Sequence, residues 1–464
     1  MSPWRATRAS EGHPHERAAA AVRGVKKNEI TRLAKQTGFQ QRHGRLTPHD
    51  FLVLLTLGQL GMPHPSLGGM VAALSSRISR EALHQRFTAP AAAFLFHCLH
   101  TVLRHKLPSV PIRTTLLQPF ARVLLVDSSS WDVSEKLCTV FPGSGGNAST
   151  ANCKLQTAYD YKQGELTFLA DTAGTVPDNG YTKHLPALIN KTDLLLIDQG
   201  YFKLTTFNAI MAKGAFFVTR FFIGTTVEDA QTQELMALDT VLRQAPGPVY
   251  ERPVRMGLGQ HQTRACRLVC LRVTAQVANA RRRRFKTHAR RQGRTGSQRH
   301  LALCDWTLLI TNVPEPWLPV DMVRALYTLR WQIEVLFKQW KSILRVHQSA
   351  TGNVHRLRCE LYGKLIAAVW VQRLHAVANT ALWNASRQEI SLAKLYKRLQ
   401  ERAFLLAQFG MGSWTQARGY LSKELEKILR HCRKHRQRSR MTTLEMLEAG
   451  VDPHLHMGQG RGLA

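Results

Sequence analysis

The sequence predicts an α/β protein in which helical regions flank a β-rich centre. Three observations support this fold class. Apolar residues recur at helical spacing within 29–116 and 357–430. Between these two regions the helical spacing of apolar residues is lost. Short apolar runs of strand length, bounded by turn residues, take its place. Two of these runs, "ARVLLVDSSS" and "TDLLLIDQGYF", end in an aspartate.

The central region can be divided into elements in order. A strand ends at Asp127 and is followed by a hairpin, "KLQTAYDYKQGELTFLADTAG", that turns near Gln163 and Gly164. A short helix ("YTKHLPALIN") precedes the strand that ends at Asp198. A helix ("LTTFNAIMAKG") with Gly214 as its C-cap then leads to the strand "AFFVTRFF". The predicted order is strand, strand, strand, helix, strand, helix, strand.

The charge of the chain predicts a nucleic-acid partner. Lys and Arg number 64 against 31 Asp and Glu, so the formal charge is +33 and the pI is about 10.6. An excess of this size favours a polyanion, because binding phosphates releases counterions. The alternative is a basic soluble protein without such a partner.

Membrane insertion and export are not expected. The longest apolar run, "FLVLLTLGQLGM", is too short to span a bilayer and predicts a core helix. The N-terminus is polar and basic and lacks an apolar signal core. The eight cysteines are scattered, and Cys266 and Cys270 have no partner pair at zinc-site spacing, so we expect reduced thiols. These features favour a cytoplasmic, nucleoid-associated protein.

Composition and periodicity suggest seven segments. They are a basic flexible arm (1–28), a helical N-terminal DNA-binding region (29–116), the first part of the core (117–222), a β-rich basic insertion (223–318), a core helix (319–350), a helical C-terminal region (351–440) and a tail (441–464). In the N-terminal region, two short amphipathic segments are broken around Ser75–Arg77. This spacing fits a DNA-reading helix-turn-helix and equally any two packed helices.

The two strand-terminal aspartates are candidate metal ligands. If their strands are parallel neighbours, Asp127 and Asp198 emerge at the same sheet edge, where binding sites in α/β folds commonly lie. Two-metal phosphoryl transfer needs such clustered carboxylates. Either residue taken alone could instead be an ordinary turn or N-cap residue.

A third carboxylate occurs in "LYTLRWQIEVLFKQWKSIL". On one continuous helix, Tyr327, Arg330, Glu334 and Lys341 fall within about 60° of one another. Pairs at i,i+4 spacing alone could explain a solvated helix. The sharper interpretation makes Glu334 a metal ligand flanked by cations that hold phosphate.

These residues resemble the DDE transposases of bacterial insertion sequences, specifically the insertion sequence 4 family. The family signature Y-x(2)-R-x(3)-E-x(6)-K matches at every position, and "LLVDSSS" and "LLLIDQGYF" match its two aspartate strands. Many members have Arg after the second aspartate, where this chain has Gln199. The resemblance, over roughly residues 30–430, implies a ribonuclease H-like catalytic core, a mixed sheet flanked by helices, with a β-rich insertion.

The resemblance also implies an activity. Asp127, Asp198 and Glu334 would be the catalytic metal ligands for Mg²⁺, with Mn²⁺ as a substitute, in cleavage and strand transfer at insertion-sequence ends. Arg330 and Lys341 would hold phosphates, and Tyr327 would contact the DNA backbone. The implied partners are double-stranded DNA, as transposon ends and target, and a second copy in a homodimeric synaptic complex.

The insertion contains further candidates for DNA binding. From Arg252 to His300 there is no Asp or Glu, and the tract beginning Arg281, Arg282, Arg283 and Arg284 is expected to contact duplex phosphates rather than form a merely solvated loop. Trp306 follows in an alternating strand. It is either a core residue or, as in hairpin-forming members of the similar family, the aromatic side chain that stacks on an extruded base.

Two other functions remain as alternatives. One is a domesticated or non-catalytic DNA-binding protein, although such a protein has no reason to cluster carboxylates near phosphate. The other is a related nuclease without strand transfer, which a Mg²⁺-dependent joining assay would distinguish.

Overall fold

The computed structural model describes residues 25–42, 44–62, 66–72, 78–104, 114–349, 351–412, 414–435 and 441–452. Most of the predicted flexible arm and the Ser75–Arg77 break lie outside this part of the chain. Contacts divide the chain into two compact units. Unit 1 comprises 1–112, 128–176 and 333–438, and unit 2 comprises 113–127, 177–332 and 439–464.

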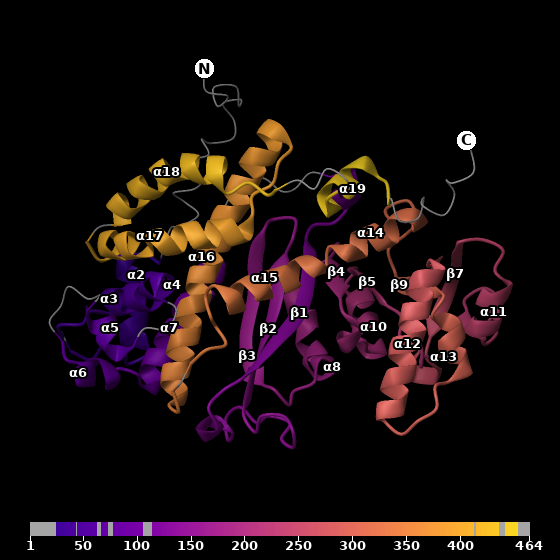
Figure 1. Cartoon of the computed structure of the whole chain (residues 1–464), viewed down its shortest axis with the longest axis horizontal. Coiled ribbons are helices and arrows are strands. Elements are labelled where there is room, and N and C mark those ends of the chain that lie inside the picture. The colour runs from indigo at the N-terminus through magenta and orange to yellow at the C-terminus, as the bar shows by residue number, and fades with distance from the viewer. Residues whose placement is uncertain are drawn as a thin grey trace. The chain divides into compact units, whose positions relative to one another are not determined.

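A nine-stranded mixed sheet forms the β-rich centre, with the order β3-β2-β1-β4-β5-β9-β8-β7-β6 (Figure 1). The strands are β1 (Val123–Asp132), β2 (Asn152–Asp160), β3 (Glu165–Ala173), β4 (Leu194–Ile197), β5 (Phe216–Arg220), β6 (Val227–Asp229), β7 (Val249–Met256), β8 (Cys266–Arg272) and β9 (Trp306–Thr311). Strands β1, β4 and β5 are parallel, and β2 and β3 form an antiparallel hairpin. The predicted element order and the predicted mixed sheet flanked by helices are confirmed.

The core strands of unit 2 are apolar because they are covered on both faces. All four residues of β4, "LLLI", are buried, as are the first four of β1. Continuous apolar runs of this kind are typical of parallel strands inside α/β proteins. The helices of unit 2 are α8 (Asp178–Tyr181), α9 (Leu185–Leu188), α10 (Leu204–Ala212), α11 (Leu238–Gln244), α12 (Ala275–Arg291), α13 (Gln298–Leu303), α14 (Val323–Thr328) and α19 (Thr443–Ala449).

Unit 1 contains most of the helical regions. Its helices are α2 (Lys27–Gln36), α3 (Pro48–Val53), the π-helix η2 (Leu54–Gly58), α4 (Gln59–Gly61), α5 (Leu67–Ala72), α6 (Arg80–His84), α7 (Ala89–Arg104), α16 (Val354–Ser386), α17 (Leu392–Gly412) and α18 (Trp414–His431). Helix α15 (Trp331–Ser342) begins in unit 2 and continues into unit 1. The predicted core helix around "FLVLLTLGQLGM" is confirmed, and η2 is fully buried within it.

Two predicted turns are also confirmed. Gly164 ends the β2–β3 turn with a φ of 69°, and the preceding Asp160 carboxylate accepts the backbone N–H of Lys162 at 3.0 Å. Gly214 has a φ of 67° and donates its N–H to Met211 after α10. Positive φ is the conformation for which glycine is favoured.

The insertion differs from its prediction in one respect. Strands β6 to β9 are present, and the arginine-rich tract, to which the sequence analysis assigned no secondary structure, is the 17-residue helix α12. Straight-chain arginines and alanines are good helix formers, and Ala278 and Ala289 bury one side of the helix. The high charge of the tract obscured this helical periodicity.

The eight cysteines are free thiols, seven of them buried, as expected for reduced side chains. Within the described ranges, no helix combines the length and the apolar composition needed to cross a membrane.

Helix α16 approaches η2 closely at one glycine, and this contact yields a stability test. A Cβ placed on Gly363 would lie 2.1 Å from the carbonyl oxygen of Leu55. Gly363→Ala should therefore lower the free energy of unfolding by about 1–3 kcal/mol through overpacking, although alanine favours helix by about 1 kcal/mol. Thermal unfolding of the purified variant measures the change.

Gly419→Ala is the matched control, since a Cβ at this position of α18 has nothing within 4 Å. This variant should retain or raise the wild-type melting temperature. Equal melting temperatures for the two variants would show that α16 does not depend on the close approach at Gly363.

Candidate active site

Asp127 and Asp198 are neighbours where the pairing of β1 with β4 ends. The predicted strand end at Asp127 was wrong, because β1 continues to Asp132. Strands β1 and β4 are parallel, and their register runs from Val123 opposite Leu194 to Val126 opposite Ile197. The residues that follow this last pair are Asp127 and Asp198. The prediction that these two strands are adjacent and parallel is therefore confirmed.

A single guanidinium joins the two carboxylates. Arg330 Nη1 lies 3.1 Å from Asp127 Oδ2, and Arg330 Nε lies 3.6 Å from Asp198 Oδ1. The Arg330 side chain is only 7% exposed, whereas the carboxylate of Asp198 is 40% exposed. One buried cation thus lies against two acidic groups, one of which remains open to solvent.

Arg330 reaches this position because the signature segment is not one helix. Helix α14 ends at Thr328 and α15 begins at Trp331. The turn between them has short-range bonds, from Arg330 N–H to Tyr327 O at 3.1 Å and from Gln332 N–H to Leu329 O at 2.9 Å. The expectation of one continuous helix was wrong, and the angles that it gave do not apply across this turn.

Tyr327 lies behind the second aspartate. Its side chain is 5% exposed, and its hydroxyl is 3.4 Å from Ile197 O and 3.5 Å from Asp198 Oδ1. Burial raises the pKa of Tyr327 to about 12, so the phenol stays neutral and can donate a hydrogen bond near neutral pH. The phenol contacts protein groups here, whereas the sequence suggested a contact with the DNA backbone.

Glu334 and Lys341 both lie on α15, within unit 1. Seven residues separate them, which is about two helical turns, so they share a face of the helix. Lys341 Nζ donates to the carbonyl of Ser130 in β1 at 2.9 Å. Burial lowers the pKa of Lys341. Unit 2 therefore brings Asp127, Asp198, Tyr327 and Arg330 together, while Glu334 and Lys341 belong to unit 1.

The aspartate pair has the chemistry of a cation site. Two carboxylates contact one positively charged group, and carboxylate oxygens are the ligands that Mg²⁺ prefers. Among the residues that the structure describes, no three His, Cys, Asp or Glu side chains are gathered closely enough to hold a metal ion. The donor set of Asp127 and Asp198 nevertheless fits a divalent metal that completes its coordination with other oxygen ligands.

Sequence reasoning missed a cation at the same edge. Strand β5 is parallel to β4, and continuing the register of Leu196 with Val218 places Arg220 opposite Asp198. Arg220 is exposed and ends its strand, as the two aspartates end their apolar runs. The signal was present in "AFFVTRFF", where a lone charge terminates an apolar strand. Arg220 is suitably placed to hold an anion beside the carboxylates.

Gln199 has a structural contact at this edge. Its side-chain amide donates to the carbonyl of Phe221 at 3.0 Å, just beyond β5. The residue that replaces the Arg of many family members therefore connects the ends of β4 and β5.

The four predicted DNA-contacting arginines of the insertion divide into two pairs. Arg281 donates to Trp306 O at 2.8 Å and to Thr307 Oγ1 at 2.9 Å, and Arg282 pairs with the Asp305 carboxylate at 2.5 Å. Their neighbours Arg283 and Arg284 are exposed on the opposite side of α12. The sequence could not separate the pairs without the helical geometry.

Trp306 is buried in the insertion. Its side chain is 5% exposed at the start of β9, opposite Arg272 of β8. The Arg272 guanidinium lies 4.7 Å from the centre of the indole ring. This packing favours the core interpretation of Trp306 over stacking on an extruded base.

Comparison with known proteins identifies the family. The "Transposase DDE domain" family matches residues 118–370. The chain is 25% identical over 400 residues to the transposase for insertion sequence element IS231E of Bacillus thuringiensis subsp. finitimus, an alignment covering 82% of this chain and 84% of that protein. It is 26% identical over 393 residues to the transposase for insertion sequence element IS1151 of Clostridium perfringens, covering 80% and 83%.

A solved structure of the piggyBac transposase synaptic complex with hairpin DNA matches with a TM-score of 0.47 and 11% identity, over 90% of this chain and 85% of that one. The family match covers more than half of this chain, including both aspartate strands and the signature segment. The chain therefore belongs to the transposase DDE domain family and is an insertion-sequence transposase, an enzyme of DNA transposition.

Proposed function

We propose that this transposase cleaves and joins insertion-sequence ends with Mg²⁺ held by Asp127, Asp198 and Glu334. The observation that carries the proposal is the position of the two aspartates. They occupy matching positions on the paired strands β1 and β4, and both contact the guanidinium of Arg330. Glu334 is the remaining carboxylate of the signature, and it completes the ligand set in the proposal. When bound, the metal ions activate the attacking oxygen and stabilise the leaving oxygen of an in-line displacement.

The side chains around the aspartates have separate roles in this proposal. Arg330 is buried between the carboxylates, so we assign it to holding them in place rather than to gripping phosphate. Tyr327 fixes the orientation of Asp198 by its neutral hydroxyl. Exposed Arg220 and half-buried Lys341 are the cations that we assign to DNA phosphates.

The partner in this proposal is double-stranded DNA, as both the element end and the target. Transposition joins two ends to one target, so a homodimer that supplies one active site to each end is the simplest synaptic assembly. The exposed side of α12, with Arg283 and Arg284, adds a duplex-phosphate contact outside the active site. Such a strongly basic bacterial-type transposase would be found in the cytoplasm, at the nucleoid.

Removing a metal ligand should separate cleavage from binding. Asp198→Ala should abolish Mg²⁺-dependent cleavage of a duplex carrying the element's own end. Binding of that duplex should persist, because the variant loses a negative charge near phosphate. Gel-resolved cleavage and fluorescence anisotropy on the same substrate measure the two properties.

Glu315→Ala is the matched control, since Glu315 is an exposed carboxylate in unit 2. It should cleave like the wild type. Substantial cleavage by Asp198→Ala in Mg²⁺ would exclude Asp198 as a ligand. Cleavage without joining in the wild type would instead support a nuclease.

The α12 arginines should behave as two classes. Replacing both Arg283 and Arg284 with Gln should weaken binding to a 40-bp duplex. It should also reduce the slope of log K against log salt by about 1.8, at about 0.9 for each lost phosphate contact. The melting temperature should not change, because both side chains are exposed.

Arg281→Gln provides the comparison. It removes the hydrogen bonds to Trp306 and Thr307, so it should lower the melting temperature and leave the salt slope close to that of the wild type. The assignment of α12 fails if the double variant keeps the wild-type slope.

A further inference from the structure

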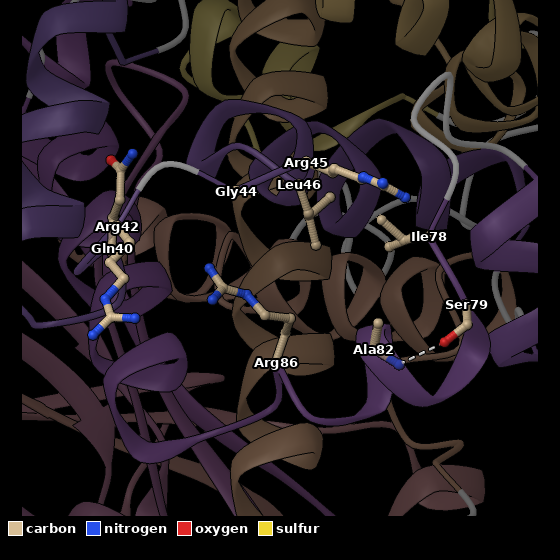
Figure 2. A pocket seen from close by; sticks show the side chains of 9 residues that line it. All are labelled: Gln40, Arg42, Gly44, Arg45, Leu46, Ile78, Ser79, Ala82 and Arg86. Atoms are coloured by element: carbon tan, nitrogen blue, oxygen red, sulfur yellow. Dashed lines mark hydrogen bonds between the residues drawn. The ribbon is translucent and has the colours of Figure 1, made fainter.

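Unit 1 contains a cavity of about 450 Å³ in the N-terminal helical region, and none of the residues assigned above lines it (Figure 2). It lies between the segment that follows α2 and the start of α6. Its lining residues are Gln40, Arg42, Gly44, Arg45, Leu46, Ile78, Ser79, Ala82 and Arg86. A volume of this size is in the range of small-ligand sites.

The cavity is strongly basic. Three of its nine lining residues are arginines, and none of the nine is acidic. The nearest acidic residues in the sequence are Asp50, whose carboxylate accepts a hydrogen bond from Thr47 and lies 3.7 Å from His49, and the exposed Glu81, which is not among the lining residues. The field in the cavity is therefore positive, and its ligand should be an anion.

Arg86 provides an independent sign of a missing partner. Its guanidinium packs 4.4 Å from the centre of the Phe39 ring, and its Nη2 donates to Phe39 O at 3.3 Å. Its Nε is buried and has no hydrogen-bond acceptor among the residues that the structure describes. Burial also lowers the pKa of Arg86 through the cost of desolvating its charge. An anion in the cavity would offset this cost and satisfy the free Nε–H.

The other lining residues can contact uncharged parts of a ligand as well as its anionic group. Leu46, Ile78 and Ala82 supply an apolar wall, and Figure 2 shows Leu46 and Ile78 on the side of Arg86 away from Arg42. The side-chain oxygen of Gln40 is buried, and no group in the described part of the chain donates a hydrogen bond to it. A nucleobase amino group can supply that donor, whereas inorganic phosphate at neutral pH is chiefly an acceptor.

We propose that this pocket binds a nucleotide unit of a DNA strand, with its phosphate on Arg86 and its sugar against Leu46 and Ile78. Arg42 and Arg45 lie on opposite sides of Arg86 (Figure 2), so they would hold the flanking phosphates of the same strand. The inference rests on the proposed function, because it supplies the DNA partner with a second site outside the carboxylate centre. Guanidinium groups suit phosphate because their planar fork donates two parallel hydrogen bonds. An apolar wall beside them suits the uncharged sugar edge of the same nucleotide.

The test uses the full-length protein and fluorescence anisotropy. The probes are a labelled 40-bp duplex and one of its single strands, and the competitors are inorganic phosphate and deoxyadenosine monophosphate. Arg42→Gln and Arg45→Gln should each weaken DNA binding about 3- to 10-fold and reduce the salt slope by about 0.9. Both arginines are exposed, so neither variant should change the melting temperature.

Two further variants sharpen the result. Arg86→Lys keeps the charge but removes the Nε–H and the fork, so it should also weaken binding. Arg32→Gln is the control for simple loss of charge, because Arg32 is exposed on α2 and pairs with Glu29. It should change binding less than twofold. The inference is overturned if the pocket variants match Arg32→Gln.

The competitors identify the source of the phosphate. In one outcome, millimolar inorganic phosphate alone displaces DNA from the wild type but not from Arg45→Gln. The pocket would then bind a free anion, and the assignment to a DNA strand would be overturned. Weak competition by both small molecules supports a strand held at several points. Failure of the proposed function is distinguishable, because the wild type would then neither bind nor cleave the element end.

Discussion

The proposed active site depends on one buried cation, Arg330, placed between two carboxylates. Asp127 and Asp198 directly follow the last paired residues of the adjacent parallel strands β1 and β4, so their negative charges would repel one another. The guanidinium contacts both and offsets this repulsion. At the opposite ends of the same strands, Arg122 pairs with the fully buried Asp193 and donates to Leu188 O at 2.9 Å. Arginine thus stabilises the β1–β4 pair at both ends.

Several other features of unit 2 are related to the placement of Arg330 between the two carboxylates. The turn between α14 and α15 directs Arg330 toward the strand ends, because a continuous helix would carry this side chain in another direction. Tyr327, from the last turn of α14, lies against Ile197 and Asp198 and closes the buried side of the pair. Arg220 ends the next strand, so two acidic groups at this edge of the sheet are followed by a basic one. An edge of this kind suits metal ions and phosphate together.

Much of this arrangement could be predicted from the sequence, for physical reasons. Apolar runs of four or five residues that end in Asp127 and Asp198 identify buried parallel strands and their shared edge. Periodicity could not show the break after Thr328, because the apolar spacing continues across it. It also could not show that α12 is helical, since arginines mask the buried alanines. Arg281 and Arg282 differ from Arg283 and Arg284 only in the side of α12 that they occupy.

The most direct test of the account is Mn²⁺ binding, measured by electron paramagnetic resonance on the wild type, Asp127→Asn and Asp198→Asn. Mn²⁺ prefers oxygen ligands as Mg²⁺ does and reports its own coordination. If the aspartates form one cation site beside Arg330, each substitution should weaken Mn²⁺ binding at least tenfold while the melting temperature stays within a few degrees of the wild type. Wild-type Mn²⁺ affinity in either variant would contradict a shared site where the pairing of β1 with β4 ends.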